Sequence, residues 1–173
     1  NEFNQWSLGK GKPMRLLHTT TWQAVFSAWR EREGNDPGWI NCAVKLKGWP
    51  DWESWRNFSA SQFGADKRSW TMYEFTDPMV EIPQVLVGPY SGWQTRLPKA
   101  NTHTFFDLMR IPEQEAWARG HEKIASMMQN FPAPTEMIGL RREDTGQIIC
   151  IEGHHRATAV ALALTAWWRG TPS

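Results

Sequence analysis

The sequence predicts an α/β protein of the α+β kind, in which two parts of different character follow one another. The apolar run Ile148–Ile151 is typical of a buried strand, and an Ala- and Leu-rich segment that predicts a helix begins within three residues. A second apolar stretch and a tight turn before this run predict a β-hairpin. Eight of the twelve tryptophans lie before residue 76: Trp6, Trp22, Trp29, Trp39, Trp49, Trp52, Trp55 and Trp70. We therefore expect a Trp-rich N-terminal subdomain over 1–75 and a second domain over 76–173.

The composition limits the classes of partner. Hydrophobic residues make up 40% of the chain and charged residues 21%, which is enough apolar content for a folded core. The net charge is +1, with ten Lys/Arg against eight Asp/Glu over 1–75 and nine against ten over 76–173. Proteins dedicated to duplex DNA carry a basic face or a high pI, so we do not expect nucleic acid as the main partner.

The cysteines and the apolar runs indicate location. Cys150 lies inside the predicted strand, where we expect a buried, unreactive thiol rather than half of a disulfide. No apolar run approaches the ~20 residues that a membrane span needs, and no signal peptide is visible. We expect a cytoplasmic protein without a membrane partner, and the oligomeric state is left open.

In the Trp-rich part, the spacing of apolar residues predicts the elements, and Gly, Pro and Asp residues predict where they begin and end. The expected elements are an irregular arm over 1–13, a helix over Thr19–Glu33 capped by Thr20 or Thr21, a strand over Trp39–Val44, a helix opening at Pro50 and Asp51, and a strand over Trp70–Phe75. Trp52 and Trp55 are one helical turn apart and share a face. They either form the core of this subdomain or line a wall for a planar ligand such as a nucleobase, with Arg56 or Arg68 near its phosphate.

The second part begins near Thr76. The expected elements are a strand over Met79–Val87 with Pro83 at an edge or bulge, a helix from Pro112 to about Gln129, a hairpin with strands over Glu136–Arg142 and Gln147–Ile151, and a last helix to about Trp168.

The turn Glu152–Arg156 is the candidate site. A strand that passes directly into a helix leaves several backbone N–H groups unpaired, and these donors with the helix dipole favour an anion such as phosphate. Gly153 lets the backbone approach a phosphate, and Arg156 offers a planar fork to two phosphate oxygens. His154 and His155 could donate to phosphate or act as general acid or base. Glu152 could hold a Mg²⁺ ion or orient a histidine.

Other interpretations of these residues stay open. Arg96 would be a second phosphate or substrate contact if the loop after Gly88 folds over the same site. Arg156 could instead pair only with Glu152, and one of the two histidines could point into the packing. A zinc site built from His154, His155, His121 and His103 is disfavoured because adjacent histidines are poor co-ligands.

Two groups of residues in the second part match a known pattern in order and spacing. The first group contains Ile82-Pro83, Pro89-Tyr90 and Gln94-Thr95-Arg96, and the second contains Gly146-Gln147-Ile148 and Gly153-His154-His155-Arg156-Ala157-Thr158-Ala159. On these residues the stretch 79–168 resembles the ParB/sulfiredoxin fold. Its Glu-Gly-His-His-Arg turn is most similar to the Asp-Gly-His-His-Arg turn of the free-serine kinases of that fold.

The resemblance implies a nucleotide ligand. DNA-partition proteins of this fold bind and hydrolyse CTP, and sulfiredoxins use ATP to repair an oxidised cysteine. The sulfiredoxin cysteine corresponds to His154 here, and the partition-type Arg pair is reduced to His155-Arg156, with no helix-turn-helix after residue 168. The acidic residue that the kinases place after their first strand is missing from the loop Gly88–Trp93, and Glu152 is the nearest substitute.

The sequence thus predicts a nucleotide-binding protein that uses ATP/ADP or CTP with Mg²⁺. The leading expectation is a kinase, phosphotransferase or nucleotide hydrolase acting on a small molecule, with Glu152, His154 and His155 as catalytic residues. Gly153, His154, His155, Arg156 and Arg96 would bind the nucleotide, and Glu152 the metal. The alternative is a non-catalytic nucleotide-sensing or regulatory module, and a DNA-associated ParB-like protein is a more distant one.

Overall fold

The structure is a computed structural model that describes residues 14–131 and 133–170. It combines helices with small antiparallel sheets, as the α+β prediction requires. The chain divides into two compact units, Met14–Glu74 and, among the described residues, those from Phe75 onward. The arm predicted over 1–13 lies outside the described residues. No helix in the described ranges has both the length and the apolar character needed to cross a membrane.

The Trp-rich unit consists of two strands and three α-helices with short irregular helical turns. In chain order these are β1 (Met14–Thr20), α1 (Trp22–Trp29) extended by a π-helical turn (Arg30–Gly34), α2 (Pro37–Asn41) extended by another (Cys42–Leu46), α3 (Trp52–Gln62), a 3₁₀ turn (Ala65–Lys67) and β2 (Trp70–Phe75). β1 pairs with β2. The first helix is confirmed, and Thr21 caps it by accepting a hydrogen bond from the backbone N–H of Ala24 at 3.2 Å.

The strand predicted over Trp39–Val44 is wrong, because these residues continue helix α2. Asp36 caps the helix by accepting from the N–H groups of Gly38 and Trp39, at 2.8 and 3.2 Å. Pro37 then fills the first helical position, where its missing N–H costs nothing. The Gly34–Gly38 stretch therefore ends one helix and starts the next.

Glu33 organises the interior of the Trp-rich unit. Its carboxylate accepts from Trp29 Nε1 at 2.7 Å and from Trp52 Nε1 at 3.0 Å. Arg56 Nε donates to the same carboxylate at 2.8 Å, and the guanidinium carbon lies 3.8 Å from the ring centroid of Trp55. Glu33, Arg56, Trp29 and Trp52 are all buried. The tryptophans at the centre are thus core, and Arg56 is committed to Glu33 rather than to a ligand.

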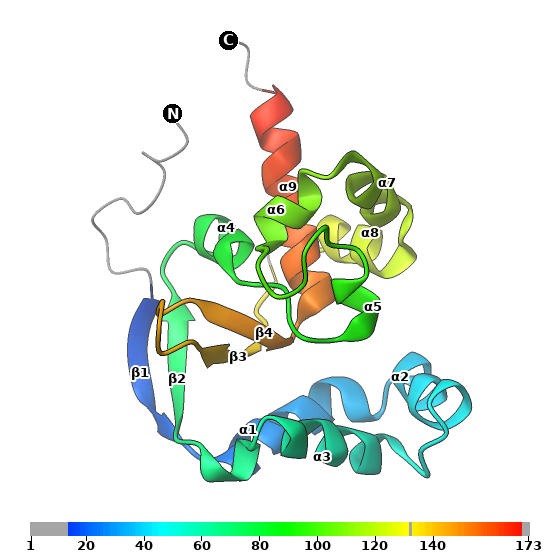
Figure 1. Ribbon diagram of the computed structural model, residues 1–173, viewed down its shortest axis with the longest axis vertical. Coiled ribbons are helices and arrows are strands. Elements are labelled where there is room, and N and C mark those ends of the chain that lie inside the picture. Colours follow the sequence, from blue (N-terminus) through cyan, green and yellow to red (C-terminus); the bar gives the residue numbers. More distant parts are fainter. Residues whose placement is uncertain (1–13, 132, 171–173) are drawn as a thin grey trace. The chain divides into compact units, whose positions relative to one another are not determined.

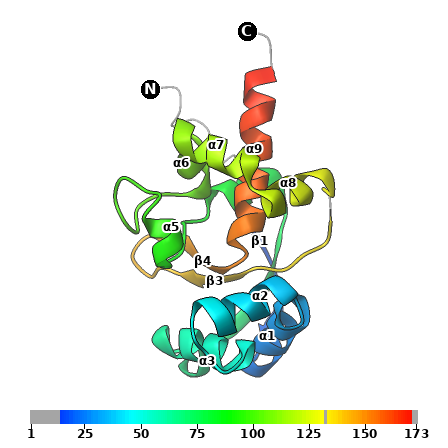
Figure 2. The same cartoon turned by 90° about the vertical axis from the view of Figure 1, so that its right-hand side faces the viewer.

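The second unit is built around one long helix. Its elements are α4 (Pro78–Glu81), a 3₁₀ turn (Ile82–Gln84), α5 (Ser91–Gln94), α6 (Phe105–Met109), α7 (Pro112–Gly120), α8 (Glu122–Gln129), β3 (Ile138–Arg141), β4 (Ile148–Glu152) and α9 (His154–Gly170). In Figure 1, α9 starts where β4 ends, and α6, α7 and α8 pack around it. Figure 2 shows the same helices from the side.

The predicted hairpin is confirmed, and a third segment joins it. β3 and β4 pair antiparallel, with Gly139 opposite Cys150 and a register irregularity next to Gly139. On the other side of β4, the N–H of Leu86 donates to the carbonyl of Ile148 at 2.8 Å, and the N–H of Cys150 donates to the carbonyl of Leu86 at 2.9 Å. This parallel contact places the segment around Leu86 directly beside the strand that leads into α9.

Two predicted elements differ from the structure. The strand over Met79–Val87 forms only around Leu86, because Pro78 opens a short helix and Pro83 lies in the 3₁₀ turn that follows. The helix over Pro112–Gln129 is broken at His121, whose backbone is extended, with φ −83° and ψ 114°. Gly120, a poor helix former, precedes the break.

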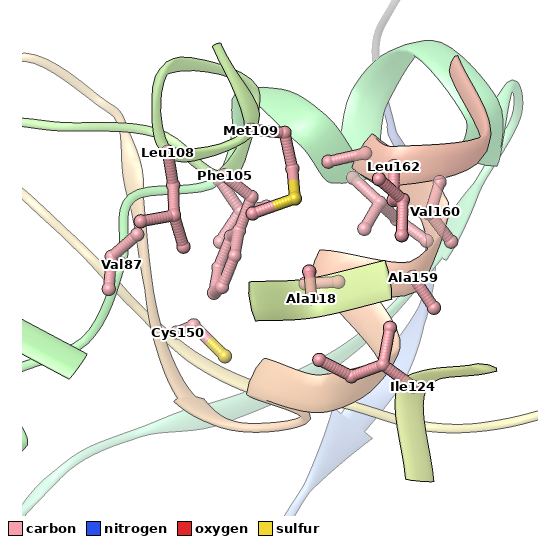
Figure 3. Close-up of a cluster of buried hydrophobic side chains, with 14 residues drawn as sticks. Val87, Phe105, Leu108, Met109, Ala118, Ile124, Cys150, Ala159, Val160 and Leu162 are labelled. Carbon is pink, nitrogen blue, oxygen red and sulfur yellow. The ribbon is translucent and has the colours of Figure 1, made fainter. Parts of the chain in front are cut away.

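The hydrophobic core of this unit lies between β4, α6 and α9 (Figure 3). Phe105, Leu108 and Met109 from α6 have no exposed surface, and the small residues of α9 let the neighbouring helices approach closely. Cys150 is fully buried here and forms no disulfide with a described residue, so the expectation of a buried thiol is confirmed. Burial raises the pKa of this thiol well above the usual value, which disfavours the reactive thiolate.

Candidate functional site

The turn between β4 and α9 requires glycine at position 153. Gly153 has φ +110°, a conformation that residues with a side chain rarely adopt. A Cβ there would lie 2.8 Å from Met137 Cγ. The Gly153 carbonyl accepts the N–H of Ala157 at 2.9 Å, so helix α9 begins at once and its first N–H groups point toward the turn.

The imidazole of His154, which the sequence predicted as a phosphate donor or catalytic residue, lies inside the packing. Its ring is buried, and its Nε2 accepts the backbone N–H of Gly88 at 3.0 Å. Because Nε2 accepts, the imidazole is neutral and carries its proton on Nδ1, which lies 3.5 Å from Cys150 Sγ. His154 therefore ties the loop after Leu86 to β4 and the start of α9. The sequence left open whether one of the two histidines points into the packing, and His154 does so.

Glu152 and Arg156 form a half-buried ion pair across one helical turn. Arg156 Nη2 donates to Glu152 Oε1, and Arg156 Nη1 donates to Thr135 Oγ1 at 2.7 Å. The side chains keep 10% and 17% of their surface exposed, so the pair is shielded from water on most sides. The structure thus shows Arg156 paired with Glu152, which the sequence offered as the alternative to a phosphate contact.

The ion pair also bears on the predicted Mg²⁺ site. Within the described residues, no group of three or more His, Cys, Asp or Glu side chains could hold a metal ion. Glu152 accepts from a cation instead. The residues of this turn do not fit a Mg²⁺ site built by the protein.

Four aromatic side chains close a ring beside the turn, which we call the Trp–His ring: Trp93 on α5, Trp117 on α7, His121 between α7 and α8, and His155 on α9. The centroid distances are 5.6 Å for Trp93–Trp117, 5.3 Å for Trp117–His121, 5.1 Å for His121–His155 and 5.2 Å for His155–Trp93. Every member thus contacts the next, although the four residues come from separate segments. The break after Gly120 is what brings His121 to this position.

Arg96 covers one side of the Trp–His ring. Its guanidinium carbon lies 3.5 Å from the ring centroid of Trp117, and its Nη1 donates to Gln114 Oε1 at 3.2 Å. Gln94 holds the loop before it, since its Nε2 donates to the carbonyl of Gly88 at 2.5 Å. The structure therefore brings Arg96 and His155 to one place, as the sequence predicted.

The charges that lower the pKa of His155 are positive. Burial, and after it the positive charges of Lys123, His121, Arg156 and Arg96, lower the pKa of His155 from 6.5 to about 3. Burial followed by the charges of Arg96 and Lys123 also lowers the pKa of His121. Both histidines are consequently neutral at neutral pH, within a cluster of permanent cations.

The sequence missed Trp93, Trp117 and Lys123 as site residues, and it considered His121 only as a zinc ligand. Trp117 lies on the apolar stripe of its helix, which made a core position the natural interpretation. The one signal was Gly120-His121 inside an otherwise helical pattern, since a glycine there indicates a break.

Comparison of the chain with protein-family models, with curated proteins and with solved structures finds no match. The Trp–His ring, Arg96 and Lys123 form a positively charged, partly buried place at the start of a long helix, which suits an anion. His154 and Glu152 are both engaged in contacts that a general base would have to break.

Proposed function

We propose that this chain is a nucleotide-binding module of the ParB/sulfiredoxin-like kind, which holds the phosphates of ATP, ADP or CTP between the Trp–His ring and the start of α9. The observation that carries the proposal is the positive charge of Arg96 and Lys123 beside His155, next to the Glu152–Arg156 ion pair. Cations held close together repel one another, and a bound polyanion would relieve that repulsion. The matches in residues 79–168 to the nucleotide-binding turn of that fold support the same ligand class.

A binding or sensing role fits the contacts better than phosphoryl transfer. Glu152, the nearest substitute for the missing acid, accepts from Arg156, and His154 is held by Gly88. A general base must reach the proton that it removes, with a pKa near the working pH. His155, with a pKa of about 3, is far from that range in the ligand-free protein. Phosphotransferase or hydrolase activity stays a prediction from the resemblance.

The proposal is tested by calorimetric titration of ATP, CTP and inorganic phosphate into the natural chain and into Arg96→Ala. Loss of a charge-assisted contact to phosphate costs about 1.5–3 kcal/mol, so Arg96→Ala should weaken nucleotide binding roughly tenfold to a hundredfold. Arg142→Ala is the matched control, since Arg142 pairs with Asp144 in the exposed hairpin turn. It should bind as the natural chain does.

Phosphorus NMR of the same mixtures separates binding from chemistry. A binding module leaves the nucleotide resonances intact over hours, whereas a kinase or hydrolase produces new phosphate species. Absence of heat and of thermal stabilisation with every nucleotide would refute the proposal. Equal affinities for the natural chain and Arg96→Ala would refute the assignment of the site.

A further inference from the structure

His121 and His155 lie side by side in the Trp–His ring, with their centroids 5.1 Å apart. The two rings come from different segments, and each also contacts a tryptophan of the ring. The Nδ1 atom of His121 is buried and has no hydrogen-bond partner among the residues that the structure describes. A buried nitrogen without a partner is costly, and natural proteins seldom keep one unless a ligand or water uses it. The pair therefore offers a polar atom to a ligand.

The groups facing the pair come from every neighbouring element. Arg96 from the loop after α5 and Lys123 from α8 act on both histidines with positive charge. Arg156 on α9 acts on His155 alone, and its charge is paired with the carboxylate of Glu152. The carboxylate of Glu122 acts on His121 in the opposite sense and more weakly. From α7, Trp117 contacts His121 and carries no charge.

Resting on the proposed function, we propose that the Trp–His ring binds a doubly charged oxoanion, such as the terminal phosphate of a nucleotide, and that the His121–His155 pair takes up one proton with it. The anion reverses the local field, so an imidazolium is then favoured. Once protonated, the imidazole donates from both nitrogens, and Nδ1 of His121 gains its partner in the anion. In the free protein burial and the neighbouring cations keep both imidazoles neutral, and an imidazole takes up its proton only when the anion binds.

Proton uptake that accompanies anion binding makes the affinity depend on pH. The free pair is neutral, and burial with the neighbouring cations keeps the pKa values of both histidines low. If the complex binds one more proton than the free protein, the affinity must increase toward tenfold for each unit by which the pH falls. The affinity should depend on pH in this way between the low pKa of the free pair and the raised pKa of the complex.

Sulfate is the probe of choice, because it remains a dianion from about pH 5 to pH 8, whereas phosphate esters titrate with a pKa of about 6. Sulfate is titrated into the full chain by calorimetry in buffers that differ in ionisation enthalpy, and ATP is titrated above about pH 7.5, where its phosphates are fully ionised. The dependence of heat on buffer gives the protons taken up. We expect about one proton for the natural chain, and a loss of most of it in His121→Gln and His155→Gln.

His18→Gln is the matched control, because His18 is an exposed histidine of the other unit. It should leave both affinity and proton uptake unchanged. Binding without proton uptake overturns this inference and leaves the proposed function standing. Uptake that survives in both ring variants also overturns it. If neither sulfate nor ATP binds at any pH, the proposed function itself fails.

Discussion

The His155 environment predicts a specific loss of stability in acid. Its pKa is about 3 in the folded chain and about 6.5 once the chain unfolds. Between these values the unfolded chain binds a proton that the folded chain rejects. The contribution of His155 to stability is therefore complete above pH 6.5 and is lost as the pH falls. From about pH 7 to about pH 5 the loss amounts to roughly 2 kcal/mol for this one group.

The assay compares the natural chain with His155→Gln. Urea unfolding in buffers without sulfate or phosphate, followed by circular dichroism, gives the free energy of unfolding at both pH values. The natural chain should lose about 2 kcal/mol more than His155→Gln, because the variant has no proton to bind at this position when unfolded. If both proteins lose the same free energy, His155 titrates normally in the folded state. The account of a histidine suppressed by burial and neighbouring cations would then be refuted.

The other predictions concern stability. Arg56→Ala should destabilise the Trp-rich unit by about 3–5 kcal/mol, since it leaves the buried carboxylate of Glu33 without its cation; chemical denaturation measures this, and a loss below about 1 kcal/mol would contradict the role of Glu33. Gly88→Ala should abolish folding or cost several kcal/mol, because a Cβ there would lie 1.9 Å from the carbonyl oxygen of Cys150. Gly92→Ala is its control, with no atom within 4 Å of the added Cβ, and its melting temperature should stay within a few degrees of that of the natural chain.

The strand and helix around the site were predictable because their signals are local. The apolar run Ile148–Ile151 matches β4, and the Ala-rich segment after it matches α9. By contrast, β1 was missed. Leu16 and Leu17 in β1 are both largely exposed, so the strand shows no alternation of buried and exposed residues from which it could be predicted.

The details of the site were less predictable, because they depend on contacts between distant segments. The pattern placed Arg96 beside the turn only on the condition that the loop after Gly88 folds over it, since 59 residues separate Arg96 from His155 in the sequence. In the structure the charge of Arg96 does act on His155. It could not decide which histidine faces the interior, since that depends on where the backbone N–H of Gly88 lies. The position of His121 depends on a helix break, and helix boundaries are the least certain part of any interpretation from sequence.

The Trp–His ring has an optical consequence. Trp93 and Trp117 each contact an imidazole, and a protonated imidazole quenches the emission of an indole that it touches, whereas a neutral one does so far less. With both histidines neutral, these two tryptophans should emit brightly at neutral pH. Any event that charges His121 or His155 should dim them. Two of the twelve tryptophans of the chain therefore contribute a component of the emission that depends on the protonation of this site.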